Sequence, residues 1–277
     1  KIELRNKSFT TPAVLQNAGV PISIITDAPV IPQKFLPLCA GLAVKAGMDP
    51  FDAVTISFGT AGTGGFGVRA DSCASYSTYS IWVITIFMLL FGVNFNFYYY
   101  LVLKRVRDAL KMEEVRCYFI IVAAATVVCF LTLMGDYSSF EAFTHSAFQV
   151  ATIITTTGFA TTDFNIWHSA AKTVLVLLMF CGACAGSTGG GIKVSRIIVF
   201  VKSAVKEVGS YIHPRSVKRV KVEGKPVEHE AIRSINVYLT TYVLLFVVSV
   251  FLISLEGKDL VPTFTSVAAT INNIGPG

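Results

Sequence analysis

Charged residues are scarce in this sequence of 277 residues. Asp, Glu, Lys and Arg make up only 14% of the chain, and 53% of the residues are hydrophobic. Soluble domains carry about 25% charged residues. The mean hydropathy is +0.63. The formal net charge of +6 would suit a nucleic-acid partner, but the basic residues gather in two loops between apolar segments. The composition therefore favours a membrane protein and no nucleic-acid partner.

Other features are missing as well. Residues 1–35 contain scattered charges and prolines rather than a clean apolar core, so no secretory signal peptide is evident. Strict alternation of polar and apolar residues is absent from the long apolar runs, which argues against a β-barrel. Cys181 and Cys184 form a C-x-x-C pair without a second Cys or His pair nearby. Packing of small residues explains that pair better than a metal or redox site does.

Several uncharged runs are long enough to cross a bilayer. They cover residues 81–103, 117–134 and 237–255, and a longer run over 173–205 is interrupted by glycines. Basic residues crowd two segments, 104–116 and 193–233. The positive-inside rule places both on the cytoplasmic side. We expect a multi-pass protein of the plasma membrane, the inner membrane in a bacterium.

Three short turns recur in uncharged stretches. They are Thr63-Gly64-Gly65, Thr156-Thr157-Gly158 and Asn273-Ile274-Gly275. Backbone carbonyls without obstructing side chains can replace the water shell of a cation. The alternative is that each glycine only ends a helix at its C′ position. Three copies in equivalent contexts favour the first interpretation, an ion selectivity filter.

The turns belong to a repeated unit of span, half-length pore helix, filter turn and span. Residues 138–154 are predicted to form such a pore helix, with Asp136 or Ser138 as N-cap. Pro50 opens a similar short helix before Thr63, and Pro262 opens one before Asn273. The predicted organisation is a partial second module at 50–104, a complete third module at 117–205, a cytoplasmic connection at 206–230 and a fourth module at 231–277. The fold class is an all-α membrane protein with repeated modules around a central pore.

A second glycine-rich segment follows the third turn. Its notable residues are Gly182, Gly186, Ser187, Thr188, Gly189, Gly190, Gly191 and Lys193. A phosphate-binding loop would require Lys directly after Gly191, where Ile192 stands. Each interior glycine costs a helix about 1 kcal/mol relative to Ala. We therefore expect the span to unwind here and to act as a gate below the filter; close helix packing through small residues is the alternative.

Two of these motifs resemble a known family. Ala183-Cys184-Ala185-Gly186-Ser187-Thr188-Gly189-Gly190-Gly191-Ile192-Lys193 is similar to the broken third-repeat helix of TrkH/KtrB-type potassium uptake proteins. Asn272-Asn273-Ile274-Gly275-Pro276-Gly277, Thr155-Thr156-Thr157-Gly158-Phe159 and Ala61-Gly62-Thr63-Gly64-Gly65-Phe66 resemble their fourth, third and second filters. The resemblance covers about residues 50–277.

The resemblance implies four pore modules in one subunit, with filter glycines here at Gly65, Gly158 and Gly275 whose carbonyls bind K⁺. It implies no covalent cofactor, a homodimer and a cytoplasmic nucleotide-binding regulatory ring of the TrkA/KtrA type. The chain contains three filter turns, so we expect it to be part of a longer protein.

The first 49 residues resemble a different family. Segments around Thr11-Pro12, Ile25-Thr26-Asp27 and Leu36-Pro37 are similar to the late barrel segment of imidazolonepropionase-like amidohydrolases. That resemblance implies a soluble fragment in which Asp27 corresponds to a metal-site carboxylate. We expect a junction near residues 49–50, either a fusion or a misjoined sequence.

Four hypotheses remain from the sequence. The first is K⁺ uptake through the filter and glycine-rich loop, without enzymatic catalysis. The second is sodium or mixed transport by the same fold, and the third is a non-conducting membrane subunit. The fourth is a metal-dependent amidohydrolase represented only by residues 1–49.

Overall fold

The computed structural model describes residues 35–45, 47–212 and 219–275. The helices are α2 (Phe35–Lys45), α3 (Pro50–Ala61), α4 (Thr78–Phe91), α5 (Phe95–Val102), α6 (Val106–Lys111), α7 (Glu113–Leu133), α8 (Ser139–Ile154), the 3₁₀ turn η1 (Phe164–Ile166), α9 (Ser169–Phe180), α10 (Val194–Ile212), α11 (His229–Ser254) and α12 (Leu260–Ile271). Strands β1 (Lys221–Val222) and β2 (Lys225–Pro226) form an antiparallel hairpin. The predicted all-α class is confirmed, with this hairpin as the sole sheet in the described parts of the chain.

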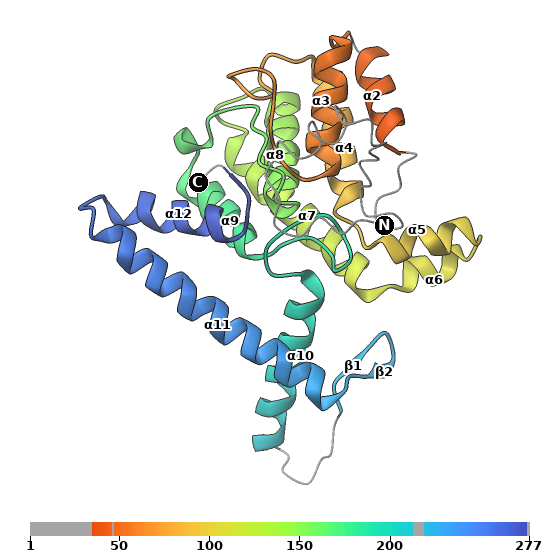
Figure 1. The fold of residues 1–277 in the computed structure, drawn as a ribbon, viewed down its shortest axis with the longest axis vertical. Coiled ribbons are helices and arrows are strands. Elements are labelled where there is room, and N and C mark those ends of the chain that lie inside the picture. Colours follow the sequence, from red (N-terminus) through yellow and green to blue (C-terminus); the bar gives the residue numbers. More distant parts are fainter. Residues whose placement is uncertain (1–34, 46, 213–218, 276–277) are drawn as a thin grey trace, which may run out of the picture.

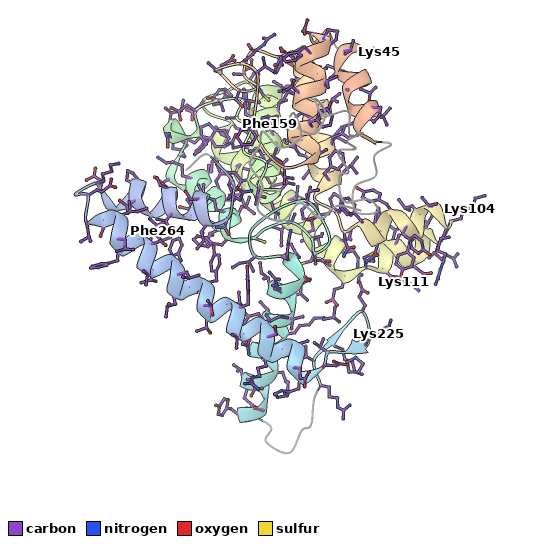
Figure 2. All side chains as sticks on the ribbon, in the orientation of Figure 1. Lys45, Lys104, Lys111, Phe159, Lys225 and Phe264 are labelled. Atoms are coloured by element: carbon purple, nitrogen blue, oxygen red, sulfur yellow. The ribbon has the colours of Figure 1, made fainter. Side chains whose placement is uncertain are left out.

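The helices form one packed body with two arms. Helices α2, α3, α4 and α8 lie together, and α7, α9 and α12 continue this body (Figure 1). Helices α10 and α11 extend away from it, and the hairpin β1–β2 lies beside α10, next to the start of α11 (Figure 1). Lys104 and Lys111 project at the tip of α5–α6 and Lys225 projects from the hairpin (Figure 2). The two predicted basic loops therefore lie away from the body that holds the turns.

Within the described residues, two helices are long and apolar enough to cross a membrane by themselves, α7 with 21 residues and α11 with 26. Helices α4 and α5 together meet the same criterion but are bent by 91° at their junction. The span predicted over residues 81–103 therefore corresponds to this bent pair rather than to one straight helix. The spans predicted at 117–134 and 237–255 correspond to α7 and α11.

The bend between α4 and α5 has an identifiable cause. Gly92 leaves no room for a side chain, because an ideal Cβ there would lie 2.5 Å from the Tyr118 hydroxyl oxygen. The Asn94 side chain then caps α5 by accepting a hydrogen bond from the Asn96 N–H at 3.0 Å. Two tyrosine hydroxyls donate to carbonyls at the end of α4, Tyr98 to Leu90 at 2.5 Å and Tyr118 to Leu89 at 3.2 Å. Carbonyls near a break in the hydrocarbon region need such partners.

The Tyr118 hydroxyl provides a test of this explanation. Tyr118 is fully buried. Tyr118→Phe removes the hydroxyl that donates to the Leu89 carbonyl and leaves a small void in its place. We expect a loss of about 1–2 kcal/mol of stability, measured as a lower midpoint of thermal unfolding in detergent. Tyr99→Phe is the matched control, because the Tyr99 ring is exposed. Equal destabilisation by both substitutions would contradict the assignment.

The half-length helices are present where they were predicted. Helix α8 begins after Ser138, whose hydroxyl accepts from the Glu141 N–H at 3.4 Å. Helix α3 begins after Asp49, whose carboxylate accepts from the Phe51 N–H at 2.9 Å. Pro262 lies in the first turn of α12. The run over 173–205 is unwound in its middle, at the glycine-rich segment 182–191 as predicted, because α9 ends at Phe180 and α10 begins at Val194.

The segment before α3 is partly described. Helix α2 places Ala43 in one core cluster with Ile56 of α3 and Ile84 of α4. Asp27 and the metal site implied by the amidohydrolase resemblance lie outside the described residues. Among the residues that are described, no group of three His, Cys, Asp or Glu side chains could hold a metal ion.

Candidate functional site

The three glycine turns have the same backbone geometry. In each, the first residue has a positive φ, 48° at Thr63, 55° at Thr156 and 56° at Asn273. In each, the glycine two positions later also has a positive φ, 67° at Gly65, 91° at Gly158 and 104° at Gly275. A β-branched residue in the left-handed region is an outlier that persists only where its surroundings enforce it. The recurrence of this pattern indicates one structural unit used three times.

One hydrogen-bond pattern ends all three preceding helices. The N–H of the second turn residue donates to a carbonyl five positions earlier, from Gly64 to Gly59, Thr157 to Thr152 and Ile274 to Ala269, each at 2.8 Å. The N–H of the first turn residue donates three positions back, from Thr63 to Thr60, Thr156 to Ile153 and Asn273 to Thr270. This pair of bonds is the Schellman motif.

The simple helix-ending role is therefore wrong for these glycines. The C′ residue of each Schellman motif is Thr63, Thr156 or Asn273, and the helix already ends there. Gly65, Gly158 and Gly275 lie two residues beyond C′, where the chain adopts a second positive φ. The conformation at these glycines needs another explanation.

The first two turns touch each other through their backbones. An ideal Cβ on Gly65 would lie 2.0 Å from the Thr157 carbonyl oxygen and 3.0 Å from the Gly158 carbonyl carbon. Phe159 is fully buried, and an ideal Cβ on Gly59 would lie 3.0 Å from its ring. Phe159 therefore packs behind its turn. The equivalent Phe66 does not, since it is 80% exposed.

The segment that follows Gly65 is tied back to α3. The buried Asp52 carboxylate accepts from the Arg69 Nε at 3.1 Å and from the Tyr76 hydroxyl at 2.9 Å. The Arg69 guanidinium also lies over the Tyr76 ring at 4.4 Å. Burial and the hydrogen bond to Asp52 raise the pKa of Tyr76 to about 12. The connection between this turn and α4 is thereby fixed.

The glycine-rich loop, residues 181–193 between α9 and α10, is a folded structure. Its base is closed by the Gly182 N–H, which donates to the Ile192 carbonyl at 2.7 Å, and by the Val194 N–H, which donates to the Ala183 carbonyl at 3.2 Å. The Lys193 ammonium donates to the Gly189 carbonyl. An ideal Cβ on Gly182 would lie 2.3 Å from the Gly190 carbonyl oxygen. The two sides of the loop are therefore too close for side chains.

The tip of the loop contacts all three turns. The Thr63 hydroxyl donates to the Thr188 carbonyl at 3.1 Å, and the Gly190 N–H donates to the Thr156 hydroxyl at 2.6 Å. An ideal Cβ on Gly190 would lie 2.6 Å from the Asn272 carbonyl oxygen. The structure thus brings the three predicted turns and the predicted loop together. The hydrogen bond between Thr63 and Thr188 joins residues 125 positions apart in the sequence.

The last turn is braced by its neighbour Asn272. The fully buried Asn272 side chain accepts from the Tyr242 hydroxyl at 2.9 Å and donates to the Ala268 carbonyl at 2.8 Å. Asn273 itself is exposed, and Ile274 is buried. The threonine hydroxyls are already engaged, since Thr157 bonds to Thr155 at 2.8 Å. Backbone carbonyls remain the accessible chemistry of the turns.

Sequence reasoning missed the residue that holds the base of the loop. The Glu114 carboxylate accepts from the Ala185 N–H at 2.6 Å and from the Ser195 N–H at 3.1 Å. It also accepts from the Asn94 side-chain amide at 3.1 Å. The signal in the sequence was weak, namely an acidic pair, Glu113 and Glu114, at the start of an apolar run.

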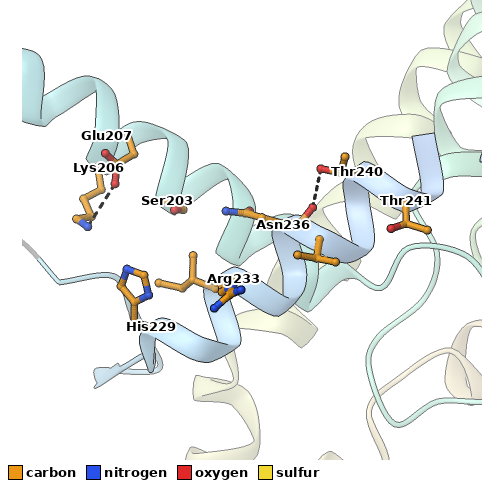
Figure 3. A pocket seen from close by; sticks show the side chains of 10 residues that line it. Ser203, Lys206, Glu207, His229, Arg233, Asn236, Thr240 and Thr241 are labelled. Carbon is orange, nitrogen blue, oxygen red and sulfur yellow. Dashed lines mark hydrogen bonds and ion pairs between the residues drawn. The ribbon is translucent and has the colours of Figure 1, made fainter. Parts of the chain in front are cut away.

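A groove of about 510 Å³ lies elsewhere, between α10 and α11. Ser203, Lys206, Glu207, His229, Arg233, Asn236 and Thr240 line it (Figure 3). Lys206 pairs with Glu207 on α10 at 3.4 Å, and the Thr240 hydroxyl donates to the Asn236 carbonyl at 2.9 Å. None of the predicted filter or loop residues line this groove. It is a separate feature, near the basic connection that follows α10.

Comparisons with known proteins agree with this geometry. Residues 35–277 match the family model for TrkH, described as a cation transport protein. The match begins before α3 and includes α2. The chain is 35% identical over 246 residues to the Trk system potassium uptake protein TrkH of Vibrio parahaemolyticus, and the aligned region covers 86% of this chain and 51% of that protein. It is 34% identical over 244 residues to TrkH of Escherichia coli K12, and the aligned region covers 86% of this chain and 50% of that protein.

A second Escherichia coli protein, the Trk system potassium uptake protein TrkG, is 31% identical over 84% of this chain and 49% of its own length. The crystal structure of the potassium transporter TrkH from Vibrio parahaemolyticus superposes with a TM-score of 0.82 at 32% identity. The superposed region covers 97% of this chain and 60% of the TrkH chain in that structure. The chain spans about half the length of these curated relatives. It belongs to the TrkH family of cation transport proteins.

Proposed function

We propose that this chain carries part of the conduction pathway of a potassium uptake protein. The observation that carries the proposal is the convergence of three turns of similar backbone geometry on one glycine-rich loop. The relatives are potassium uptake proteins of Trk systems, and this gives the cation. The same observation favours transport over enzymatic catalysis, because the site offers carbonyl oxygens and no paired acid and base.

The turns have the chemistry of a cation filter. Each follows the C-terminal end of a short helix, where the helix dipole is negative. Carbonyl oxygens at Gly65, Gly158 and Gly275 would replace the hydration shell of K⁺, and Thr63, Gly64, Thr156, Thr157, Asn273 and Ile274 complete the filter segments. The modules at 50–104, 117–205 and 231–277 each contribute one segment to this pathway.

The loop has the features expected of a gate. It contacts all three turns, and glycines allow its backbone to approach them closely. The Thr188 hydroxyl is buried and has no hydrogen-bond partner among the described residues, which leaves an oxygen for a cation or a water molecule. The loop must move, or its carbonyls must coordinate the passing ion, before K⁺ can pass.

The partners follow from the same assignment. Helix α11 exposes apolar side chains such as Val243, Val247 and Phe251 along its length, a surface suited to membrane lipid or to a second copy in a homodimer. The basic connection at 206–230 is the part of the chain suited to a cytoplasmic nucleotide-binding regulatory subunit. These partners belong to the proposal.

The filter assignment has a direct test in Gly158→Ser. Gly158 has a φ of 91°, a region that serine disfavours. In the complete protein reconstituted in liposomes, we expect the selectivity for K⁺ over Na⁺ to fall by roughly tenfold, the size of a ~1.4 kcal/mol difference. Competition of NaCl against ⁸⁶Rb⁺ uptake measures it.

Gly257→Ser is the matched control, because Gly257 also has a positive φ, 75°, but follows α11 away from the turns. Unchanged selectivity in Gly158→Ser would remove the filter assignment. A wild-type protein that carries Na⁺ as well as Rb⁺ would support the sodium or mixed alternative, and one that carries neither would support a non-conducting subunit.

A further inference from the structure

Glu114 is a buried carboxylate that forms no salt bridge in the described structure, although the Lys193 ammonium of the loop acts on it at longer range. It is 7% exposed and lies in the first turn of α7. Its Oε1 accepts from the backbone N–H groups of Ala185 and Ser195, and its Oε2 accepts from the Asn94 side chain. Because a buried charge requires such compensation, these three donors account for its position.

Two helix ends also favour a negative charge at this point. Glu114 is the second residue of α7, and Ser195 is the second residue of α10. The positive ends of two helix dipoles therefore face one carboxylate. Hydrogen bonds from backbone N–H groups to a charged acceptor are about twice as strong as those between neutral groups.

The carboxylate holds both sides of the glycine-rich loop. Ala185 lies in its first half, and Ser195 lies just after its end, at the start of α10. The bend between α4 and α5 is held to the same place, because the Cys184 N–H donates to the Gly92 carbonyl at 3.0 Å and the Phe95 N–H donates to the Gly186 carbonyl at 3.3 Å. A loop that leaves the turns must either carry these bonds along or break them.

We propose that Glu114 is the positioning residue that sets the resting place of the loop beneath the three turns. The proposal rests on the proposed function, in which the loop acts as the gate. The loop withdraws only when Ala185 or Ser195 leaves the carboxylate, so the strength of these bonds fixes how rarely the loop opens. Glu114 touches no ion in this scheme and acts only through the loop.

Glu114→Gln tests the proposal in the complete protein. The amide keeps the size of the side chain but removes its charge, and its NH₂ group cannot accept a hydrogen bond. Glu113→Gln is the matched control, since the adjacent Glu113 pairs with Lys202 at 2.5 Å and accepts from the Glu223 N–H, without a hydrogen bond to the loop. The two substitutions make the same chemical change at neighbouring positions.

The first measurement does not depend on transport. Cys184 lies in the loop and is fully buried, so a charged methanethiosulfonate reagent added from the cytoplasmic side reports loop opening. The background protein has Cys184 as its only cysteine. In it, we expect Cys184 to be labelled roughly tenfold to a hundredfold faster in the Glu114→Gln variant than in the protein that retains Glu114. This is the scale of one charge-assisted hydrogen bond. Glu113→Gln should label at the original rate.

The second measurement is ⁸⁶Rb⁺ flux into liposomes. We expect basal flux to rise several-fold in Glu114→Gln with the preference for Rb⁺ over Na⁺ unchanged, a combination that general destabilisation does not produce. If Glu114→Gln fails to fold, Glu114→Asp retains the charge but has a shorter reach, and its labelling rate should lie above that of the original protein.

Two results would overturn the proposal. Labelling of Cys184 that is equally slow with and without the Glu114 substitutions is one, and equal acceleration by Glu113→Gln is the other. A protein that carries no Rb⁺ in any variant would contradict the proposed function instead, while the labelling rates would still decide the role of Glu114.

Discussion

Gly65→Ala in the complete protein is expected to lower ⁸⁶Rb⁺ uptake by about a hundredfold or more, the largest loss of any single substitution considered. The added Cβ would lie 2.0 Å from the Thr157 carbonyl oxygen. The added Cβ is fixed rigidly to the backbone and the atom it meets is a backbone oxygen, so the turns themselves must separate. The φ of 67° adds about 1–2 kcal/mol of strain for a residue with a Cβ. Carbonyl ligands displaced in this way no longer replace the hydration shell of the ion.

Gly135→Ala is the control for this substitution. Gly135 follows α7, has a negative φ, and has no atom within 4 Å of an ideal Cβ. It should retain full uptake and the original unfolding midpoint. Gly65→Ala with normal uptake and normal ion selectivity would show that the contact between the two turns does not matter for conduction.

Gly190→Ala is expected to have the opposite effect, a rise of about tenfold in basal ⁸⁶Rb⁺ flux. Its Cβ would lie 2.6 Å from the Asn272 carbonyl oxygen and 3.2 Å from the Thr156 hydroxyl oxygen. The loop then cannot rest against the turns at its closest point. Loss of the hydrogen bond from the Gly190 N–H to Thr156 removes about 1–1.5 kcal/mol that holds it there.

Gly209→Ala on α10 is the matched control, because an ideal Cβ there meets nothing within 4 Å. It should leave the basal flux unchanged. A fall in flux in Gly190→Ala would contradict the role of the loop as a barrier and would favour a loop whose carbonyls line the path. General misfolding lowers flux, so it cannot imitate the expected rise.

The sequence indicated the repeated elements well, for local reasons. Caps mark the starts of two short helices at Asp49 and Ser138, and Pro262 marks the first turn of the third. A run of glycines marks the unwound loop, because glycine disfavours a helix by itself. The repetition of the turns was visible because their lack of charge and their glycines recur in equivalent contexts. These signals need no knowledge of tertiary contacts.

The contacts between the elements were not predictable in the same way. The bend at Gly92 depends on Tyr118 and on the Thr155 side chain, which fill the space next to it. Glu114 was inconspicuous because its partners, Ala185 and Ser195, contribute only backbone N–H groups. The opposite exposures of Phe66 and Phe159 depend on which neighbours surround each turn. Each of these features is a tertiary property of the packed helices.

The way in which α8 ends, with Thr156 at its C′ position, affects the sign of the charge that the turn can accept. The N–H groups of Thr155, Thr156 and Thr157 all donate to carbonyls of α8, and the Gly158 N–H donates to the Thr152 hydroxyl at 3.1 Å. Every backbone N–H of this stretch is consumed within its own module, so backbone carbonyls are the groups left to face outward. An anion finds no hydrogen-bond donor in the backbone here. If the turn acts as the proposed filter, we expect it to reject anions because of how α8 ends, even when the side chains of the turn are replaced, as long as the Schellman motif forms.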